Sequence, residues 1–433
     1  MFLFVRYDSA MEQNPSAAAG SASKAEAPRV GRRTERIVGR LREERRLKQE
    51  QERTAAARDL TGISDIGVPD APVPSVDDER RRGRGAVSNA TGRFEPHARE
   101  AFDDGWESLD ELQPFRTSVT VERPRTIINR NNSPDVGFDR SINPYRGCEH
   151  GCVYCFARPT HAYQGYSAGL DFETKLFAKP DAPELLAKEL SRAGYEPRTI
   201  ALGINTDGYQ PIEREWRLTR RILEVLRDFG HPVGIVTKSA LILRDLDILA
   251  PMAERGLVKV ALSVTTLDHK LARTMEPRAA TPMRRIETIR RLSEAGVPTA
   301  VLAAPMIPAI NDAELERILD TAAAAGATEA GYVMIRLPLE ILDLFKEWLL
   351  AHFPDRYRHV LSLVKEMHGG KEYDSTFGQR MKGSGPYAWT VARRFEIAAE
   401  RLGLNKRHLR LTNRHFRRPP MPGEQLSLFG EER

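Results

Sequence analysis

The chain has 433 residues, of which 41% are hydrophobic and 29% are charged, and it carries a formal net charge of +6. That hydrophobic content is enough for one large folded core, and the absence of any run of about 18 apolar residues excludes a membrane-spanning segment. The mildly basic balance suits an anionic partner such as nucleic acid, and we expect a cytoplasmic protein without membrane association.

The first 85 residues are rich in Ala, Ser, Glu and Arg and contain few large apolar side chains. We predict that residues 1–85 are disordered or loosely helical, because such a segment cannot bury enough apolar surface to fold. A solvated tail is one interpretation, and a nucleic-acid-binding arm is the other. Aromatic and apolar residues then appear, and residues 86–139 are predicted as an extended segment that leads into the core.

Short apolar runs alternate with helical patterns in the middle of the chain. The predicted buried strands cover residues 199–204, 233–237, 258–264, 298–304 and 331–335. The predicted helices cover residues 183–193, 218–229, 243–255, 282–295 and 312–325. A glycine follows each helix, where a left-handed residue commonly ends one, namely Gly194, Gly230, Gly256, Gly296 and Gly326.

Five such units, together with a strand near the cysteines, predict the α/β class with a parallel sheet. Six strands fall short of the eight of a closed TIM barrel, so we expect an open, partial (β/α)6 barrel of TIM type. The core domain is predicted over residues 140–340. A helical extension is expected over residues 341–404, and a basic tail over residues 405–433.

All three cysteines of the chain lie within eight residues, as Cys148, Cys152 and Cys155. An odd, clustered set favours a metal site over a disulfide framework. Three thiolates on one loop can ligate three irons of a [4Fe–4S] cluster and leave the fourth iron open for another ligand. The alternative is a zinc knuckle with His150 or His161 as fourth ligand, although zinc sites usually draw ligand pairs from two places in the chain.

The Cys-x3-Cys-x2-Cys spacing, with Tyr154 before the last cysteine, resembles the radical S-adenosylmethionine (SAM) superfamily. Within it, the chain resembles spore photoproduct lyase and its bacterial relatives. Short motifs at residues 205–207, 236–238, 262–263 and 275–277 follow the order of that family over about residues 140–336. The resemblance implies a [4Fe–4S] cluster and SAM as cofactors. The residues implied to contact SAM are Tyr154, Thr206, Asp207, Lys238, Ser263 and Glu276.

The resemblance also implies reductive cleavage of SAM to a 5′-deoxyadenosyl radical, with an electron donor such as flavodoxin or ferredoxin. Two positions depart from the lyase pattern. Ile204 stands where the lyase has its hydrogen-donating cysteine, and Phe156 stands where it has a tyrosine. No catalytic residue is therefore assigned, and Tyr163, Tyr166 and Tyr209 are alternatives for the missing hydrogen relay.

The end of the chain suggests a partner. Residues 401–418 carry seven Lys and Arg residues and no acidic residue. The peptide that follows resembles the pentapeptide by which bacterial replication and repair proteins bind the sliding clamp, and it consists of Gln425, Leu426, Ser427, Leu428 and Phe429. Folding of this peptide onto its own domain is the alternative.

Together these features predict a radical SAM enzyme that acts on DNA or a DNA lesion. One alternative is radical SAM modification of RNA, a protein or a small molecule. The other is a non-catalytic iron–sulfur adaptor associated with DNA.

Overall fold

The computed structural model describes residues 76–99 and 113–419, which belong to one compact unit. A second unit, residues 5–72, lies outside the described residues. The prediction for residues 1–85 therefore falls on undescribed residues up to residue 75, and the clamp-binding peptide lies outside the described residues altogether. No helix in the described ranges is long and apolar enough to cross a membrane.

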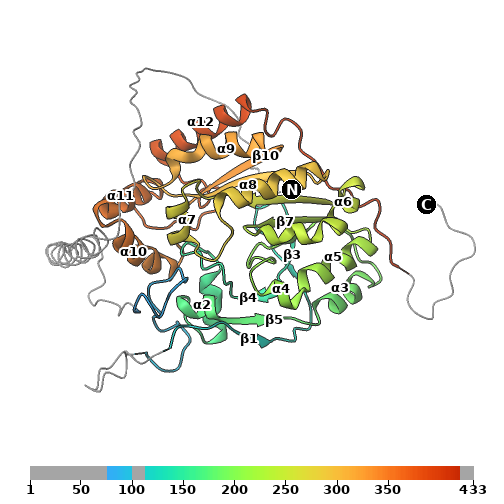
Figure 1. Cartoon of the computed structure of the whole chain (residues 1–433), viewed down its shortest axis with the longest axis horizontal. Coiled ribbons are helices and arrows are strands. Elements are labelled where there is room, and N and C mark those ends of the chain that lie inside the picture. Colours follow the sequence, from blue (N-terminus) through green and yellow to red (C-terminus); the bar gives the residue numbers. More distant parts are fainter. Residues whose placement is uncertain (1–75, 100–112, 420–433) are drawn as a thin grey trace, which may run out of the picture. The chain divides into compact units, whose positions relative to one another are not determined.

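A seven-stranded sheet forms the centre of the unit, in the order β10-β9-β8-β7-β6-β3-β2 (Figure 1). Six of its strands are parallel, and β2 pairs antiparallel with β3 at one edge. The strand bounds are β2 Ile128–Arg130, β3 Arg140–Ile142, β6 Ile200–Leu202, β7 Val233–Thr237, β8 Val258–Ser263, β9 Thr299–Met306 and β10 Glu329–Met334. Six parallel strands in an open order confirm the predicted α/β class and the partial (β/α)6 barrel.

A small second sheet lies beside the region that carries the cysteines, in the order β1-β5-β4. Its strands are β1 Ser118–Val121, β4 Tyr145–Arg146 and β5 Lys175–Ala178. The cysteines follow β4, and the chain then passes through the 3-10 helix η2 (Arg158–Gln164) and helix α2 (Leu170–Thr174) to β5. Because β4 and β5 pair, they fix both ends of the cysteine-bearing segment.

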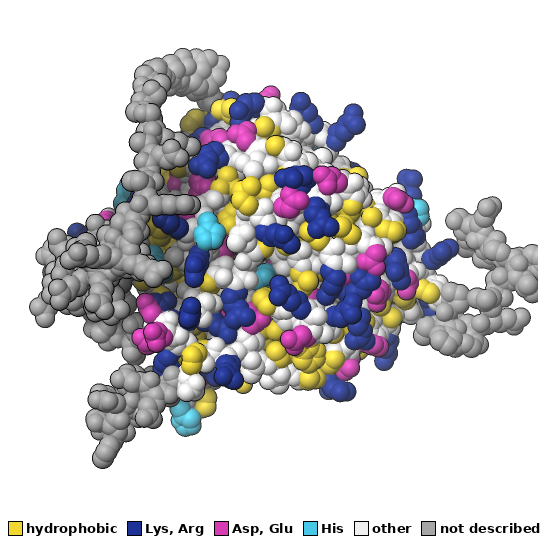
Figure 2. All heavy atoms as spheres, viewed as in Figure 1, with side chains coloured by type: hydrophobic (Ala, Val, Ile, Leu, Met, Phe, Trp, Pro, Cys, Tyr) yellow, Lys and Arg dark blue, Asp and Glu magenta, His cyan; other side chains and the backbone are white. Residues whose placement is uncertain are grey.

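The predicted helices are all present with slightly shorter bounds, as α3 Ala182–Leu190, α5 Leu218–Asp228, α6 Leu246–Glu254, α8 Pro282–Glu294 and α9 Leu315–Ala324. The five glycines predicted at their ends all have positive φ, between 59° and 98°. Two short helices also follow strands, α4 Glu213–Trp216 and α7 His269–Met275. Figure 2 shows Lys and Arg side chains over α5 and α6 interleaved with acidic ones, consistent with ion pairs such as Arg220–Asp247.

Three further helices follow the barrel, α10 Ile341–His352, α11 Tyr357–Met367 and α12 Gly385–Arg401. The indole of Trp348 on α10 is buried and donates to the carbonyl of Thr274 on α7, so α10 is anchored beside the end of α7, where Glu276 is the C-cap.

The segment after α12 runs along the amino ends of the parallel strands. The backbone N–H of Asn405 donates to Thr328 at the start of β10, that of Thr412 to Gly256 before β8, and that of Arg417 to Phe229 before β7. This segment, residues 405–417, is drawn in red in Figure 1 and leaves α12 along one side of the sheet. The basic stretch of the sequence thus lies at the amino ends of the strands.

Candidate functional site

The three cysteines lie on a tight loop between β4 and η2, which we call the cluster loop (residues 147–157). Cys148 and Cys152 are buried, Cys155 is partly buried, and all three thiols are free. Successive turns shape the loop, because the N–H of Gly151 donates to Cys148 and that of Cys155 to Cys152. Gly151 has a φ of 70°, in the region that favours glycine.

A fully buried ion pair contacts the backbone of the cluster loop. Arg158 pairs with Glu173 on α2 at 2.6 Å, and both side chains are completely buried. The same guanidinium donates through Nε to the carbonyl of Cys152 at 2.8 Å. Since a buried charge is tolerated only when it is paired and hydrogen-bonded, this arrangement fixes the backbone at Cys152.

Gln210 holds the opposite side of the loop. Its side-chain oxygen accepts from the N–H of Glu149 at 2.9 Å, and its amide nitrogen donates to the carbonyl of Gly147 at 3.1 Å. Gln210 is fully buried, so these two hydrogen bonds are shielded from water.

Residues 84–86, where the predicted N-terminal region meets the predicted lead-in segment, cross directly over the cluster loop, which the sequence did not indicate. The N–H groups of Gly85 and Ala86 donate to the Glu173 carboxylate at 2.9 and 2.8 Å. A Cβ atom on Gly85 would lie 1.7 Å from the carbonyl oxygen of Gly151. Arg84, which is buried, donates to the carbonyl of Glu173 at 2.9 Å. Residues 84–86 therefore form part of the wall around the cysteines.

The electrostatic surroundings of the thiols fit a positively charged group. Burial raises the pKa of all three thiols, to about 12 for Cys152, and the charges of Cys152 and Cys155 raise that of Cys148 further. Lys238 opposes this shift at Cys152 and Cys155. Thiolates in this place need additional compensating cations, which the irons of a cluster would supply.

Of the two histidines considered as zinc ligands, His150 faces a carboxylate, whereas His161 packs among aromatic rings and its buried Nε2 has no hydrogen-bond partner among the described residues. His150 is buried with Nδ1 3.4 Å from an oxygen of Asp207. The ring of His161 packs between Phe172 and Phe177, and burial lowers its pKa to about 4. Within residues 76–99 and 113–419, no three His, Cys, Asp or Glu side chains form a group able to hold a single metal ion. A four-iron cluster makes a different demand, because each thiolate binds its own iron.

Lys238 and Ser263 meet at the carboxyl ends of neighbouring strands. Lys238 follows β7 and donates from Nζ to the hydroxyl of Ser263, the last residue of β8, at 2.9 Å. The ammonium also lies 5.7 Å from the ring centre of Tyr154 in the cluster loop. The structure thus brings these three predicted residues together.

Glu276 connects the cluster loop to the sheet. It accepts a hydrogen bond from the hydroxyl of Tyr154, forms an ion pair with Arg285 on α8, and lies 3.9 Å from the sulfur of Cys152. Thr265 adds a further contact, with its hydroxyl 3.3 Å from the same carboxylate. Burial alone would raise the pKa of Glu276, but the charges of Arg285 and Lys238 outweigh it and hold the pKa below its ordinary value.

Thr206 and Asp207 follow β6, and their side chains form hydrogen bonds with other residues of the chain. The Thr206 hydroxyl donates to the carbonyl of Tyr145 at 2.9 Å. The Asp207 carboxylate accepts from the hydroxyl of Thr237 and from the N–H of Lys238, both at 2.8 Å. Asp207 therefore holds the strand end that presents Lys238, while the Thr206 hydroxyl is committed to the backbone.

The remaining predicted residues are spread around the loop. Tyr209 is buried, whereas Tyr163 is largely exposed. The ring of Tyr166 packs against Phe177, with the ammonium of Lys175 4.7 Å from its centre. These positions do not single out one tyrosine as a hydrogen donor.

Sequence reasoning missed the functional surroundings supplied by Arg84, Gly85, Thr265 and Arg285. No local motif marks these residues, because each acquires its role through a partner distant in the chain. The separation between Gly85 and Glu173, for example, is 88 residues.

Comparisons with known proteins indicate the family of the chain. A family model described as the radical SAM superfamily matches residues 142–322, a range that contains all three cysteines. An uncharacterized protein of Mycobacterium tuberculosis is 37% identical over 234 residues, which make up 53% of this chain and 69% of that protein. An uncharacterized protein of Methanocaldococcus jannaschii is 27% identical over 222 residues, covering 51% and 78% of the two chains. A solved spore photoproduct lyase, complexed with dinucleoside spore photoproduct, has 15% identity and a TM-score of 0.48 over 66% of this chain and 80% of that one.

Proposed function

This chain belongs to the radical SAM superfamily and is a radical SAM enzyme, and we propose that Cys148, Cys152 and Cys155 hold its [4Fe–4S] cluster. The predicted superfamily and enzyme class are thereby confirmed. The observation that supports the ligand assignment is a loop with three free, largely buried thiols beside the cation of Lys238. Three protein ligands leave one iron open, and we assign that position to SAM.

When bound, the cluster and SAM supply reductive cleavage to a 5′-deoxyadenosyl radical, with the electron delivered by a donor such as flavodoxin or ferredoxin. In this proposal the Lys238 ammonium neutralises the SAM carboxylate, and Ser263 holds that ammonium in place. Glu276 orients the hydroxyl of Tyr154, and Asp207 fixes the backbone of Lys238. Since Glu276 and Ser263 are buried, the same residues help to exclude water from the site.

For the substrate we propose DNA or a DNA lesion. Support comes from the net charge of +6, from the exposed basic residues of segment 405–417, and from the predicted clamp-binding peptide Gln425–Phe429. The enzyme would work in the cytoplasm, where a reduced electron donor and DNA are both at hand. RNA, a protein or a small molecule remains the second candidate substrate class.

The hydrogen relay of the spore lyase is not carried over to this chain. Ile204 occupies the position of the donor cysteine, and the three cysteines present are all assigned to the cluster. Phe156 has no hydroxyl to pass on a hydrogen atom. Any return of hydrogen to a product must therefore use another group or the 5′-deoxyadenosine itself.

Anaerobic reconstitution tests the proposal. The reduced protein is expected to hold about four irons per chain and to form 5′-deoxyadenosine from SAM. Cys152→Ala should lose the cluster and this product together. An intact cluster without 5′-deoxyadenosine would contradict the proposed reaction, and unchanged iron content in Cys152→Ala would contradict the ligand assignment. If the purified protein holds zinc instead of iron, the alternative of a zinc knuckle is favoured.

The clamp contact is tested separately. Deletion of Gln425–Phe429 should abolish capture of the chain by the immobilised bacterial sliding clamp, and retained capture would reject the peptide as the binding element.

A further inference from the structure

Three exposed aromatic side chains start at the cluster loop and continue along the neighbouring surface. Phe156, which follows the last cysteine directly, is 42% exposed, Tyr163 on η2 is 68% exposed and Phe94 in the lead-in is 56% exposed. Single exposed aromatic residues are common on protein surfaces, but a group of them usually marks a binding site.

Two of these rings already stack on each other. The rings of Phe94 and Tyr163 have centres 5.4 Å apart and planes inclined by 28°. The guanidinium carbon of Arg93 lies 5.4 Å from the first ring centre and 6.0 Å from the second. The result is a stacked pair of exposed aromatic rings on the surface, with a guanidinium group beside it.

The third ring has an arginine of its own. The guanidinium carbon of Arg336, just after β10, lies 5.4 Å from the ring centre of Phe156. The Nε of Arg336 is buried without a hydrogen-bond partner, and among the described side chains no carboxylate forms an ion pair with it. Its charge is therefore available to an anion that reaches this point.

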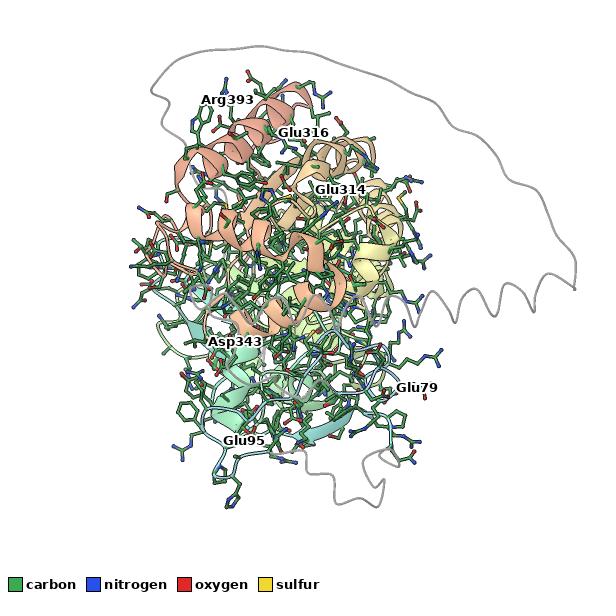
Figure 3. All side chains as sticks on the ribbon, turned by 90° about the vertical axis from the view of Figure 1, so that its left-hand side faces the viewer. Glu79, Glu95, Glu314, Glu316, Asp343 and Arg393 are labelled. Atoms are coloured by element: carbon green, nitrogen blue, oxygen red, sulfur yellow. The ribbon has the colours of Figure 1, made fainter. Side chains whose placement is uncertain are left out.

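Contacts of Arg93 reach the two chain segments that carry the third ring and its arginine. Arg93 donates to the carbonyl of Pro159, three residues after Phe156, at 3.3 Å, and it pairs with Glu340, four residues after Arg336. We call Phe156, Arg336, Arg93, Tyr163 and Phe94 the aromatic–arginine strip. Figure 3 labels Glu95, which follows Phe94 in the chain, and shows it below Asp343 of α10 in that view.

We propose that the aromatic–arginine strip binds an unpaired segment of single-stranded DNA and leads it toward the cluster loop. Bases stack on aromatic faces whatever their sequence, and the guanidinium of Arg336 can pair with a phosphate between them. Bases within an intact duplex are not free to stack in this way, so the strip is specific for an unpaired strand. This inference rests on the proposed action on DNA and specifies the form in which DNA reaches the site.

Fluorescence anisotropy with a labelled oligothymidylate of about 15 nucleotides tests the strip on the full-length, cluster-loaded chain. The double variant Phe94→Ala/Tyr163→Ala is expected to bind about tenfold more weakly or worse, while Tyr163→Phe keeps wild-type affinity because its ring is retained. Trp389→Ala is the matched control, since Trp389 is 57% exposed but lies on α12, and its affinity should not change. An unchanged affinity in the double variant would overturn the proposal.

Arg336→Gln tests the anion contact. The slope of log affinity against log salt should become shallower by the contribution of about one phosphate contact. A salt dependence equal to that of the wild type would overturn this contact.

Two further measurements distinguish failure of the strip proposal from failure of the proposed function. Binding of an RNA of the same length with equal or higher affinity would overturn the assignment to DNA. Formation of 5′-deoxyadenosine without nucleic acid reports on the cofactor site alone. If the protein forms 5′-deoxyadenosine but binds no single-stranded DNA, the proposed role of the strip is rejected and the proposed radical SAM reaction stands.

Discussion

At the scale of single residues, the pair Glu276–Arg285 places two opposite charges in the interior beside Cys152, and both side chains are about 1% exposed. Glu276→Gln keeps the shape of the side chain but leaves Arg285 without a counter-charge. Breaking such a pair typically costs about 3–5 kcal/mol in the free energy of unfolding. We expect a loss of that size at neutral pH, measured by urea denaturation of the cluster-free proteins.

The pH dependence follows from the lowered pKa of Glu276. A carboxyl whose pKa is lower in the folded state stabilises the protein above its unfolded pKa, here near 4.5, and loses that contribution as the pH falls further. The difference between wild type and Glu276→Gln should therefore shrink below about pH 4.5. Glu287→Gln is the control. Its pair with Arg290 is exposed, so its effect should stay within about 0.5 kcal/mol at either pH.

Lys238 is the residue on which SAM binding is expected to depend most. Lys238→Met removes the ammonium that contacts Ser263 and faces the ring of Tyr154. Loss of a charge-assisted hydrogen bond costs about 1.5–3 kcal/mol, so the dissociation constant of SAM should rise by roughly one to two orders of magnitude. Anaerobic calorimetry on the cluster-loaded protein measures it. Lys175→Met, which removes a partly exposed ammonium paired with Asp171, should change the constant less than twofold, and equal effects in both variants would contradict the assigned role.

How far single residues could be predicted depends on where their partners lie. The clustered spacing of the cysteines singled out Cys148, whereas Lys238 was singled out by the resemblance to the radical SAM superfamily and by its place at a strand end. Arg285 is one of several arginines on α8, and nothing local distinguishes it from Arg284 or Arg290. Only the packing of α8 against β8 shows that Arg285 is buried while its neighbours are exposed.

At the scale of elements, the central strands and helices were predictable because buried parallel strands are continuous apolar runs and glycines mark the helix ends. The small sheet was not predicted. Strand β4 has two residues, and the burial pattern of β1 does not alternate clearly, so neither carries a readable period. The crossing of residues 84–86 over the cluster loop was also beyond prediction, since it depends on Glu173 far along the chain.

The crossing makes Gly85 sensitive to substitution. In Gly85→Ala the new methyl group would lie 1.7 Å from the carbonyl oxygen of Gly151, so one of the two backbones must move. Movement of Gly151 shifts the loop between Cys148 and Cys152. We expect reduced iron content per chain and a loss of several kcal/mol in stability, measured by iron analysis and thermal unfolding.

Gly194→Ala is the matched control for Gly85→Ala. Gly194 has a φ of 75° but open space around its Cβ position. Its substitution should cost only about 1 kcal/mol, from the left-handed backbone, and leave the iron content unchanged. Iron loss of equal size in the two variants would show that the contact with Gly151 is not the cause.

At the scale of the whole molecule, the two candidate contacts with DNA lie on different parts of the barrel. Lys238 and Ser263 mark the carboxyl ends of the strands, where the cofactor site is proposed. The basic segment 405–417 binds to the amino ends, for example through the N–H of Leu409 and the carboxylate of Glu329. This segment therefore cannot present a base to the cluster. We interpret it as a sequence-independent phosphate contact that keeps DNA near the enzyme, whereas the aromatic–arginine strip receives the unpaired strand.

This division predicts different salt behaviour for duplex DNA. Arg410, Arg414 and Arg417 are exposed on the segment, and their joint replacement by Gln removes up to three phosphate contacts. The slope of log affinity against log salt should then become shallower by roughly two to three, because each contact contributes about 0.9. Anisotropy titrations with a labelled duplex at several salt concentrations measure this slope. The control replaces Arg284, Arg290 and Arg291, which are exposed on α8, so it loses the same charge at another place. If both triple variants lower the slope equally, net charge rather than the segment governs association, and the segment loses its assigned role.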